Sequence, residues 1–519
     1  MFQSKYQLSS SKAIALICDD CRSDLDQFLP NFEEVINELV NSVEVEPLIR
    51  ERIINSYASI IQGVKDPQIQ GENLIKILNL VDGKAYQVVA ELNNANGNGG
   101  SNINPDVLLD YLTSLITCLA SIAKGMQVPD ELEDYYTSEQ IAVIQQYWSI
   151  DQLGIRNKIL HIISTYELND TLVCNLTIME QMTYVFKYGL TESIPGPFVF
   201  NTESILQFII ANFNRDSNSN NNSNGKVNNS LDTYPLLYNL YDSLIVSRSS
   251  EPMISESMVN TLDLIFFTKL EIIKADPDMI QSSINLFSSI LAVKPSLLIS
   301  PSSSSQQQQE LSKQQSQYKN NLINPDLTTH QQPQQDQQPL LLPILQFTIS
   351  NFQTNEKFVL RSLSTFWTKL INLRKGSRSD HMMIKRLFNE TDMGQVLTFN
   401  LIKYMLLTTR SNLEYFTDVL RVLIAKFPMG VSNWLKNTFV ELNNERQILA
   451  QKQEQEQDIE VVDVNGNPDV GCSGNDVRAV KPITNSEIFI KKLLLTRGNR
   501  ECRNVIKDFW LCVNGLIDY

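Results

Sequence analysis

Few side chains in this 519-residue chain are suited to catalysis or to metal binding. Its three histidines are His161, His330 and His381, and none of them has the spacing that binds a metal from one helix. His161 lies in an apolar helical pattern, His330 in a serine- and glutamine-rich tract, and His381 near an expected helix start. We therefore expect no enzyme, no catalytic, cofactor-binding or metal-binding residues, and no cofactor.

The sharpest local spacing of reactive residues is Cys18-Asp19-Asp20-Cys21, which could be half of a redox or zinc site. No second cysteine pair follows at the distance of a zinc site, and no strand precedes the pair as a thioredoxin-like motif requires. One helical turn would instead place both thiols on the same buried stripe. We expect Cys18 and Cys21 to be core residues.

The net charge of the chain limits the kinds of macromolecule that it can bind. The formal charge is −15 and the isoelectric point about 4.9, whereas binding to a nucleic acid backbone needs a basic surface. We expect no direct nucleic acid partner. An acidic surface fits solubility in water or contact with basic proteins. Residues 374–378, Arg374-Lys375-Gly376-Ser377-Arg378, are a small basic exception that we interpret as a solvated turn.

Cysteine content and apolar runs indicate the compartment. Seven cysteines, an odd number without the spacing of a disulfide framework, are typical of a reducing environment. The first residues lack the apolar core of a signal peptide, and the most apolar stretch, residues 111–123, is too short and too rich in threonine and serine to cross a bilayer. We expect a protein of the cytoplasm and nucleus with no membrane partner.

Apolar residues recur at helical spacing along most of the chain, with 42% hydrophobic residues available for burial. Residues 9–25 predict a first helix partnered by residues 28–40, and a short helix pair follows Pro67 and ends near residue 94. The predicted buried stripes include Ala13, Ile14, Ile17, Cys18, Cys21 and Leu25; Phe358, Leu363, Phe366, Trp367, Leu370 and Ile371; Met383, Leu387, Val396, Phe399, Ile402, Leu406 and Leu407; and Leu413, Phe416, Leu420, Leu423 and Ile424. The tryptophans at 148, 367, 434 and 510 also fall on such stripes and are expected to be core anchors.

Helices with one apolar stripe need neighbours, and stacked helix pairs supply them. Because compact cores stop growing near about 250–300 residues, the chain is either several domains or one elongated array. The spacing of about forty residues per pair favours an all-α solenoid, a right-handed superhelix of HEAT-like hairpins with disordered polar inserts. The predicted division is helical repeats at 1–215, 231–298 and 339–450, an Asn/Ser-rich insert at 216–230, a Ser/Gln-rich insert at 299–338, a polar linker at 451–484 and final helices at 485–519.

Several segments resemble, in the same order, the second half of the transportin-three and importin-thirteen branch of the importin-β (karyopherin) superfamily. They are residues 11–22 (SKAIALICDDCR), 104–110 (NPDVLLD), Trp148, Phe427-Pro428 with Trp434-Leu435, and 501–509 (ECRNVIKDF). The resemblance covers most of the chain apart from the polar inserts. It departs from the family at residues 169–189, where an arginine-rich helix is expected and no arginine is present.

The resemblance implies a nuclear transport receptor that binds protein cargo, is switched by the Ran GTPase and touches phenylalanine-glycine nucleoporins. The family's Ran-binding repeats lie mainly in the amino-terminal half, and this chain begins where the second half would begin, so we expect a cargo-binding half. Import is the expected direction, and no cargo-contact residues are assigned. The alternative is a static HEAT-repeat scaffold of a multi-subunit complex.

Overall fold

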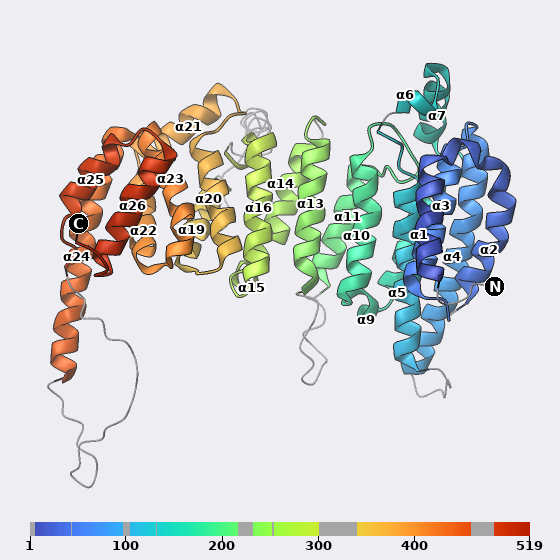
Figure 1. The fold of residues 1–519 in the computed structure, drawn as a ribbon, viewed down its shortest axis with the longest axis horizontal. Helices are drawn as coiled ribbons and strands as arrows, with labels where there is room; N and C mark the ends of the chain where they lie inside the picture. Colours follow the sequence, from blue (N-terminus) through green and yellow to red (C-terminus); the bar gives the residue numbers. More distant parts are fainter. Residues whose placement is uncertain are drawn as a thin grey trace, which may run out of the picture. The chain divides into compact units, whose positions relative to one another are not determined.

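The computed structural model describes residues 6–42, 44–96, 104–130, 132–215, 232–251, 254–299, 340–457 and 482–518. Every regular element in these ranges is a helix, so the all-α expectation is confirmed (Figure 1). The chain divides into two compact units, Met1–Leu270 and Glu271–Tyr519. The helices stack within each unit, as a solenoid requires.

The first unit contains thirteen labelled α-helices and three 3-10 turns among its described residues. They are α1 (Gln7–Asp20), η1 (Arg22–Asp24), η2 (Asp26–Phe28), α2 (Leu29–Asn41), α3 (Pro47–Gly63), α4 (Pro67–Asn96), α5 (Pro105–Gly125), α6 (Leu132–Tyr135), α7 (Ser138–Ile150), α8 (Ile155–Glu167), α9 (Asp170–Val173), α10 (Leu176–Thr191), α11 (Thr202–Asn214), α13 (Tyr234–Arg248), α14 (Ile254–Ile265) and η4 (Phe267–Lys269). The division between the units falls within α15 (Leu270–Ile273).

The second unit continues the helical pattern. Its elements are α16 (Pro277–Val293), α17 (Ser296–Ile299), α19 (Leu341–Ser350), η5 (Asn351–Gln353), α20 (Lys357–Ile371), α21 (Arg378–Asn389), α22 (Met393–Leu407), η6 (Arg410–Asn412), α23 (Leu413–Lys426), α24 (Pro428–Gln457), α25 (Ser486–Leu495) and α26 (Asn499–Val513).

Each unit is built from rows of helices packed side by side. In the first unit, α1, α3, α5, α10 and α13 are successive neighbours, and α2, α4 and α8 form a second row packed against them. In the second unit, α16, α20, α23 and α26 form one row, and α22, α24 and α25 pack beside it (Figure 1). The apolar stripes meet between the rows, which buries them on both sides as the sequence pattern requires.

Helix α5 shows how the core is made. Its residues Leu112, Leu115, Ile116, Leu119 and Ile122 are fully buried. Among the described residues it is the one helix long and apolar enough to span a membrane, but 67% of its most apolar window is buried inside the fold. It is longer than the apolar stretch expected from the sequence, and its surroundings are those of a core helix.

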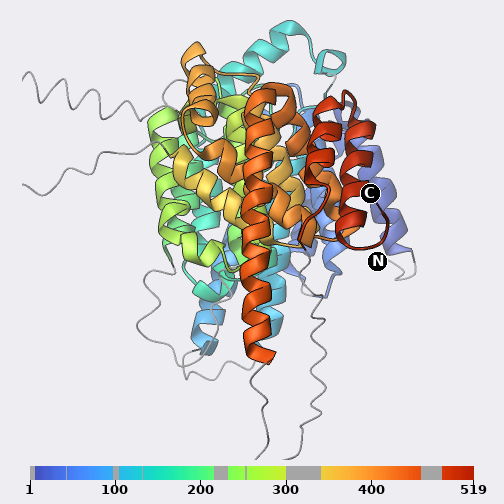
Figure 2. The ribbon, with the colours of Figure 1, turned by 90° about the vertical axis from the view of Figure 1, so that its left-hand side faces the viewer.

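Three element boundaries differ from the sequence predictions. The expected short helix pair after Pro67 is one helix of 30 residues, α4, because the exposed Gly83 continues the helix rather than ending it. The expected single segment through Met383 and Leu407 is two helices, α21 and α22. Helix α24 runs to Gln457, past the predicted linker start at 451, and extends beyond the other helices of its unit (Figure 2).

Packing at the amino-terminal end also differs. The expected partner of α1 was residues 28–40, but α1 packs chiefly on α3. Ile17 is 55% exposed, and Ala13 and Cys21 are also exposed, so the predicted stripe of α1 is wrong at these three positions, although Cys18 is buried. Phe358, placed on a buried stripe of α20, is 62% exposed. The predicted stripe of α21 and α22 is wrong at three positions, because Met383, Val396 and Leu407 are 40%, 42% and 69% exposed. Helix formation is therefore better predicted by periodicity than the exact buried face.

The large predicted inserts fall mostly outside the described residues, namely 216–231 and 300–339, as does most of the polar linker, 458–481. The predicted domain boundaries and the handedness of the superhelix therefore stay predictions. The tryptophans divide into two kinds. Trp148 and Trp367 are buried core anchors as expected, and Trp434 and Trp510 are only partly buried.

Candidate functional site

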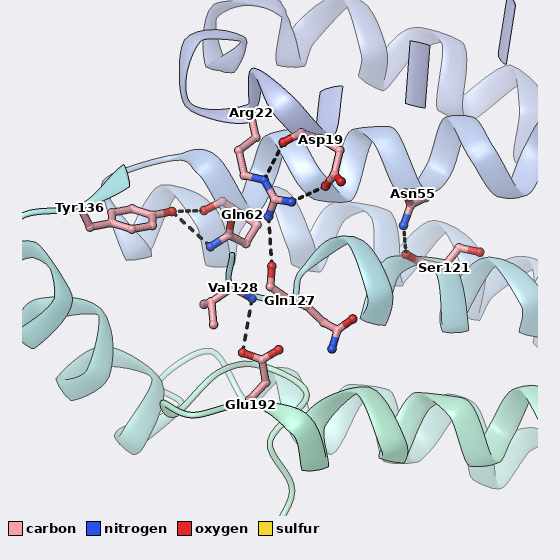
Figure 3. A network of polar contacts seen from close by, with 9 residues as sticks. All are labelled: Asp19, Arg22, Asn55, Gln62, Ser121, Gln127, Val128, Tyr136 and Glu192. Atoms are coloured by element: carbon pink, nitrogen blue, oxygen red, sulfur yellow. Dashed lines mark hydrogen bonds and ion pairs between the residues drawn. The ribbon is translucent and has the colours of Figure 1, made fainter. Parts of the chain in front are cut away.

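A buried arginine near the start of the chain joins segments that are far apart in sequence. Arg22 lies in η1 and is 8% exposed. Its Nη1 atom donates to Gln62 Oε1 at 2.8 Å and to the carbonyl oxygen of Gln127 at 3.0 Å, and its Nε atom donates to the carbonyl oxygen of Asp19 at 3.1 Å (Figure 3). The Asp19 carboxylate also pairs with the guanidinium. The charge is thus satisfied where burial would otherwise be costly.

A second set of polar contacts extends this network to α7. The Tyr136 hydroxyl donates to the carbonyl oxygen of Gln62, and Gln62 Nε2 donates back to that hydroxyl at 3.2 Å (Figure 3). Gln70 Nε2 donates to the carbonyl oxygens of Gln62 and Val64, each at 2.7 Å. Trp148 Nε1 donates to Gln70 Oε1 at 3.3 Å. Burial raises the pKa of Tyr136 to about 12, so the phenol stays protonated and keeps donating.

The third element of the network is the loop after α10. Glu192 accepts a hydrogen bond from the backbone N–H of Val128, with 3.3 Å between nitrogen and Oε2 (Figure 3). Burial raises the pKa of Glu192 to about 7, although the Val128 N–H, Gln127 and Arg22 act in the opposite direction. Gln127 Nε2 also donates to Thr191 Oγ1 at 2.8 Å. The loops that follow α5 and α10 are therefore fixed to each other.

Gln62, Tyr136 and Glu192 line a small cavity of about 20 Å³, room for about one water molecule. Its lining is mostly apolar, with Met126, Ile144, Trp148 and Phe198 among the side chains. A cavity of this size does not admit a substrate or a cofactor. We define Arg22, Gln62, Gln127, Tyr136 and Glu192 as the junction network, whose chemistry is that of a structural lock between successive repeats.

Among the described residues, none of those considered for catalysis or metal binding gathers into a site, and His330 lies outside the described residues. Cys18 is buried and Cys21 exposed, so the two thiols do not share an environment. His161 is 61% exposed, and its Nδ1 lies 3.3 Å from Asp82 Oδ1, beside the ion pair of Asp82 with Lys158. No group of three or more His, Cys, Asp or Glu with metal-binding geometry occurs among the described residues.

The segments on which the family resemblance was based hold structural positions. Asn104 caps α5, its Oδ1 accepting from the N–H of Asp106 at 3.0 Å. Phe427 and Trp434 form an aromatic cluster with Phe388 of α21. The closing segment is α26, in which Cys502, Ile506 and Phe509 are fully buried.

Comparisons with known proteins agree with this family resemblance. Residues 2–126 match the family model described as the importin beta-like KAP122 middle domain. Over these residues the chain is similar to the importin beta-like family. Among solved structures, it shares the fold of importin 13 in its cytosolic state, with a TM-score of 0.60, 11% sequence identity and coverage of 98% of this chain. It spans 46% of the length of that importin 13 chain. Comparison with curated proteins found no match.

The importin β-like match covers α1 to α5, including Arg22 and Gln62, and the fold match extends over nearly the whole chain. The first match shows what residues 2–126 are similar to, and the second shows the fold. The other three members of the junction network, Gln127, Tyr136 and Glu192, lie outside the matched segment. Sequence reasoning missed the whole network, because its members are single polar residues that only the fold brings together.

Proposed function

We propose that this chain is a nuclear transport receptor that binds protein cargo for nucleocytoplasmic transport, in the direction of nuclear import. The observation that carries the proposal is the importin β-like match of residues 2–126, continued by a stack of helices with the importin 13 fold. The chain spans 46% of that importin 13, and the part of this function that we propose for it is cargo binding.

The proposed function depends on a large binding surface and not on catalytic side chains. Rows of amphipathic helices present their polar faces over a large area, on which a folded protein can be held by many weak contacts. The junction network keeps neighbouring repeats in register, because Arg22 joins η1 to α3 and to the segment after α5. Cargo, phenylalanine-glycine nucleoporins and the Ran GTPase are the partners that this function requires. The shuttling it implies places the protein in both cytoplasm and nucleus.

A permeation assay tests the proposal directly. The full chain has a mass of 59.1 kDa, and an inert protein of that mass enters the nuclei of permeabilised cells slowly. We expect the labelled chain to accumulate at the nuclear rim and to enter faster than an inert protein of equal mass. Entry at the same rate as the inert protein, without accumulation at the rim, would contradict the proposal.

Capture experiments define the partners. The immobilised chain is incubated with nuclear and cytosolic extracts, with and without Ran locked in its GTP form. We expect nucleoporins and transported proteins to be retained, with cargo retention changed by Ran if this half contributes to the switch. Stoichiometric capture of the subunits of one enzyme complex, with no nucleoporin, would instead identify a scaffold.

A further inference from the structure

The acidic charge of this chain is concentrated in its first unit. Residues 1–270 contain 33 Asp and Glu against 16 Lys and Arg, whereas residues 271–519 contain 25 against 27. In a chain of net charge −15, carboxylate clusters are expected on any surface, but clusters of exposed bases are not. A basic surface in the second unit is therefore the more informative feature.

Such a surface lies on α21 and on the turn that precedes it. Its charged members are Arg374, Lys375, Arg378, Lys385 and Arg386, all of them exposed. The sequence indicated only the first three, as a solvated turn, and the helix adds two more. We call these five residues, with Met382 and Met383, the basic helix face.

The charges of the basic helix face are available to a partner. Between residues 374 and 389 the sequence contains a single carboxylate, Asp380, which is 1% exposed and caps α21. Arg386 has an ion pair with Glu390 at 4.0 Å, in which both side chains are more than 60% exposed. Such a pair contributes little. Within the described part of the chain, the other four bases have no ion pair.

The backbone of the turn that carries these charges has a defined conformation. Gly376 has a φ of 134°, which other residues adopt only with strain. The backbone N–H of Ser377 donates to Asp380 Oδ2 at 2.7 Å, and the N–H of Asp380 donates to Ser377 Oγ at 3.1 Å. This reciprocal capping box fixes the start of α21. A partner that binds here has less conformational entropy to remove.

The opposite face of α21 is anchored by aromatic contacts. Phe388 is buried and stacks on Phe427, with 4.9 Å between ring centroids. Trp434 completes the cluster and packs so closely on Gly394 that a Cβ there would lie 2.2 Å from the indole. Figure 1 shows α21 lying across one end of the upright helices of its unit.

This anchoring leaves the outer face uncovered. Positions 378, 382 and 386 follow one another at four-residue steps and so share that face. Met382 is 46% exposed and Met383 40% exposed. Flexible, polarizable methionines adapt well to varied apolar side chains. The face thus combines positive charge with two apolar contact points.

We propose that the basic helix face binds an acidic segment of a partner protein, in which carboxylates alternate with apolar side chains. The carboxylates would pair with the arginines and lysines, and the apolar side chains would contact Met382 and Met383. Twelve helical residues extend about 18 Å, which is the reach of about six extended residues. This goes beyond the transport role, because it requires only this surface and an acidic sequence.

A protein segment fits better than a nucleic acid. Phe388 of α21 is buried and His381 is half-buried, so the face offers no fully exposed ring on which bases could stack. A long polyanion would also extend beyond the five bases and meet a chain with a net charge of −15. A short acidic segment fits within the basic helix face and avoids that repulsion.

The test uses the full chain and a fluorescein-labelled peptide of eight residues, with four glutamates and two leucines between terminal glycines. Fluorescence anisotropy measures its Kd at several salt concentrations. The variant Lys385→Glu with Arg386→Glu should weaken binding at least tenfold and reduce the salt dependence. The variant Met382→Ala with Met383→Ala should weaken binding about threefold or more and leave the salt dependence unchanged.

A matched control reverses the same number of charges elsewhere in the second unit. Lys357 and Lys436 are exposed, and Lys357→Glu with Lys436→Glu gives the same net charge as the first variant. We expect the control to change the Kd less than threefold, and circular dichroism to show that all variants stay folded. The inference is overturned if the peptide does not bind, if the control weakens binding as much as the first variant, or if an eight-nucleotide single-stranded DNA binds more tightly than the peptide.

Discussion

Replacing Glu192 by glutamine should make the junction network more stable at neutral pH, and the gain should disappear in acid. The folded-state pKa of about 7 lies above the ordinary value of 4.5, because burial disfavours the carboxylate. Folding therefore becomes less favourable as the pH rises from 4.5 through 7, and the full cost is present above pH 7. Glutamine keeps an oxygen that accepts from the Val128 N–H and removes the charge.

The size of the effect follows from the two pKa values. The interval from 4.5 to about 7 corresponds to about 3 kcal/mol at pH 8, where both states are ionised. At pH 5.5 the folded carboxyl is neutral and the unfolded one is mostly ionised, so about 1.4 kcal/mol remains. The stability advantage of Glu192→Gln should thus grow by about 2 kcal/mol between pH 5.5 and 8, a factor of about thirty.

Hydrogen exchange at the Val128 amide measures this directly, because that N–H is the donor to Glu192. The protection factor of the variant, relative to the unmodified chain and corrected for intrinsic exchange, should rise about thirtyfold from pH 5.5 to 8. The exposed Glu34 provides the control, and Glu34→Gln should give a constant ratio. A constant ratio for Glu192→Gln as well, or lower protection at pH 8, would refute the reasoning.

Further substitutions probe packing and buried charge, with urea denaturation as the measurement. Gly83→Ala should stabilise the first unit by about 1 kcal/mol, because a Cβ at this helical position meets nothing within 4 Å. Gly189→Ala should destabilise it by more than about 2 kcal/mol, because a Cβ there would lie 1.8 Å from the carbonyl oxygen of Phe198. Arg50 is 1% exposed and donates to the carbonyl oxygen of Leu39 at 3.0 Å. Arg50→Ala should lower the free energy of unfolding by about 3 kcal/mol or more, since several carbonyl groups lose their donor. Tyr136→Phe should cost about 1 kcal/mol through loss of its bond to the Gln62 carbonyl. Equal urea midpoints for Gly83→Ala and Gly189→Ala, or unchanged midpoints for the other two, would contradict these expectations.

Local sequence signals predicted much of the fold. Proline is the first residue of both α3 and α5, at Pro47 and Pro105, and Asn104 caps α5, so these starts follow from local sequence. Periodicity correctly indicated buried residues such as Leu363 and Trp367. These signals work because capping and amphipathicity depend on residues within one or two turns of each other.

Other features depend on partners that local patterns do not reveal. Ile17 looks like a core residue but is 55% exposed, because α1 packs on α3 through a different face. Arg22 looks like a surface residue but is buried, because Gln127 accepts its hydrogen bond from 105 positions away. Burial in the assembled fold likewise raises the pKa of Glu192. The junction network is thus a product of the assembled repeats.

The contacts of Arg22 limit how this chain can be divided. Repeat proteins commonly tolerate the removal of end modules, because each repeat touches only its neighbours. Here a cut after residue 126 would remove the Gln127 carbonyl from a buried guanidinium, and the truncated piece would have to hydrate or refold that region. A piece that ends at residue 126 should therefore be less stable than one that keeps the following loop, because Arg22 loses one of its acceptors.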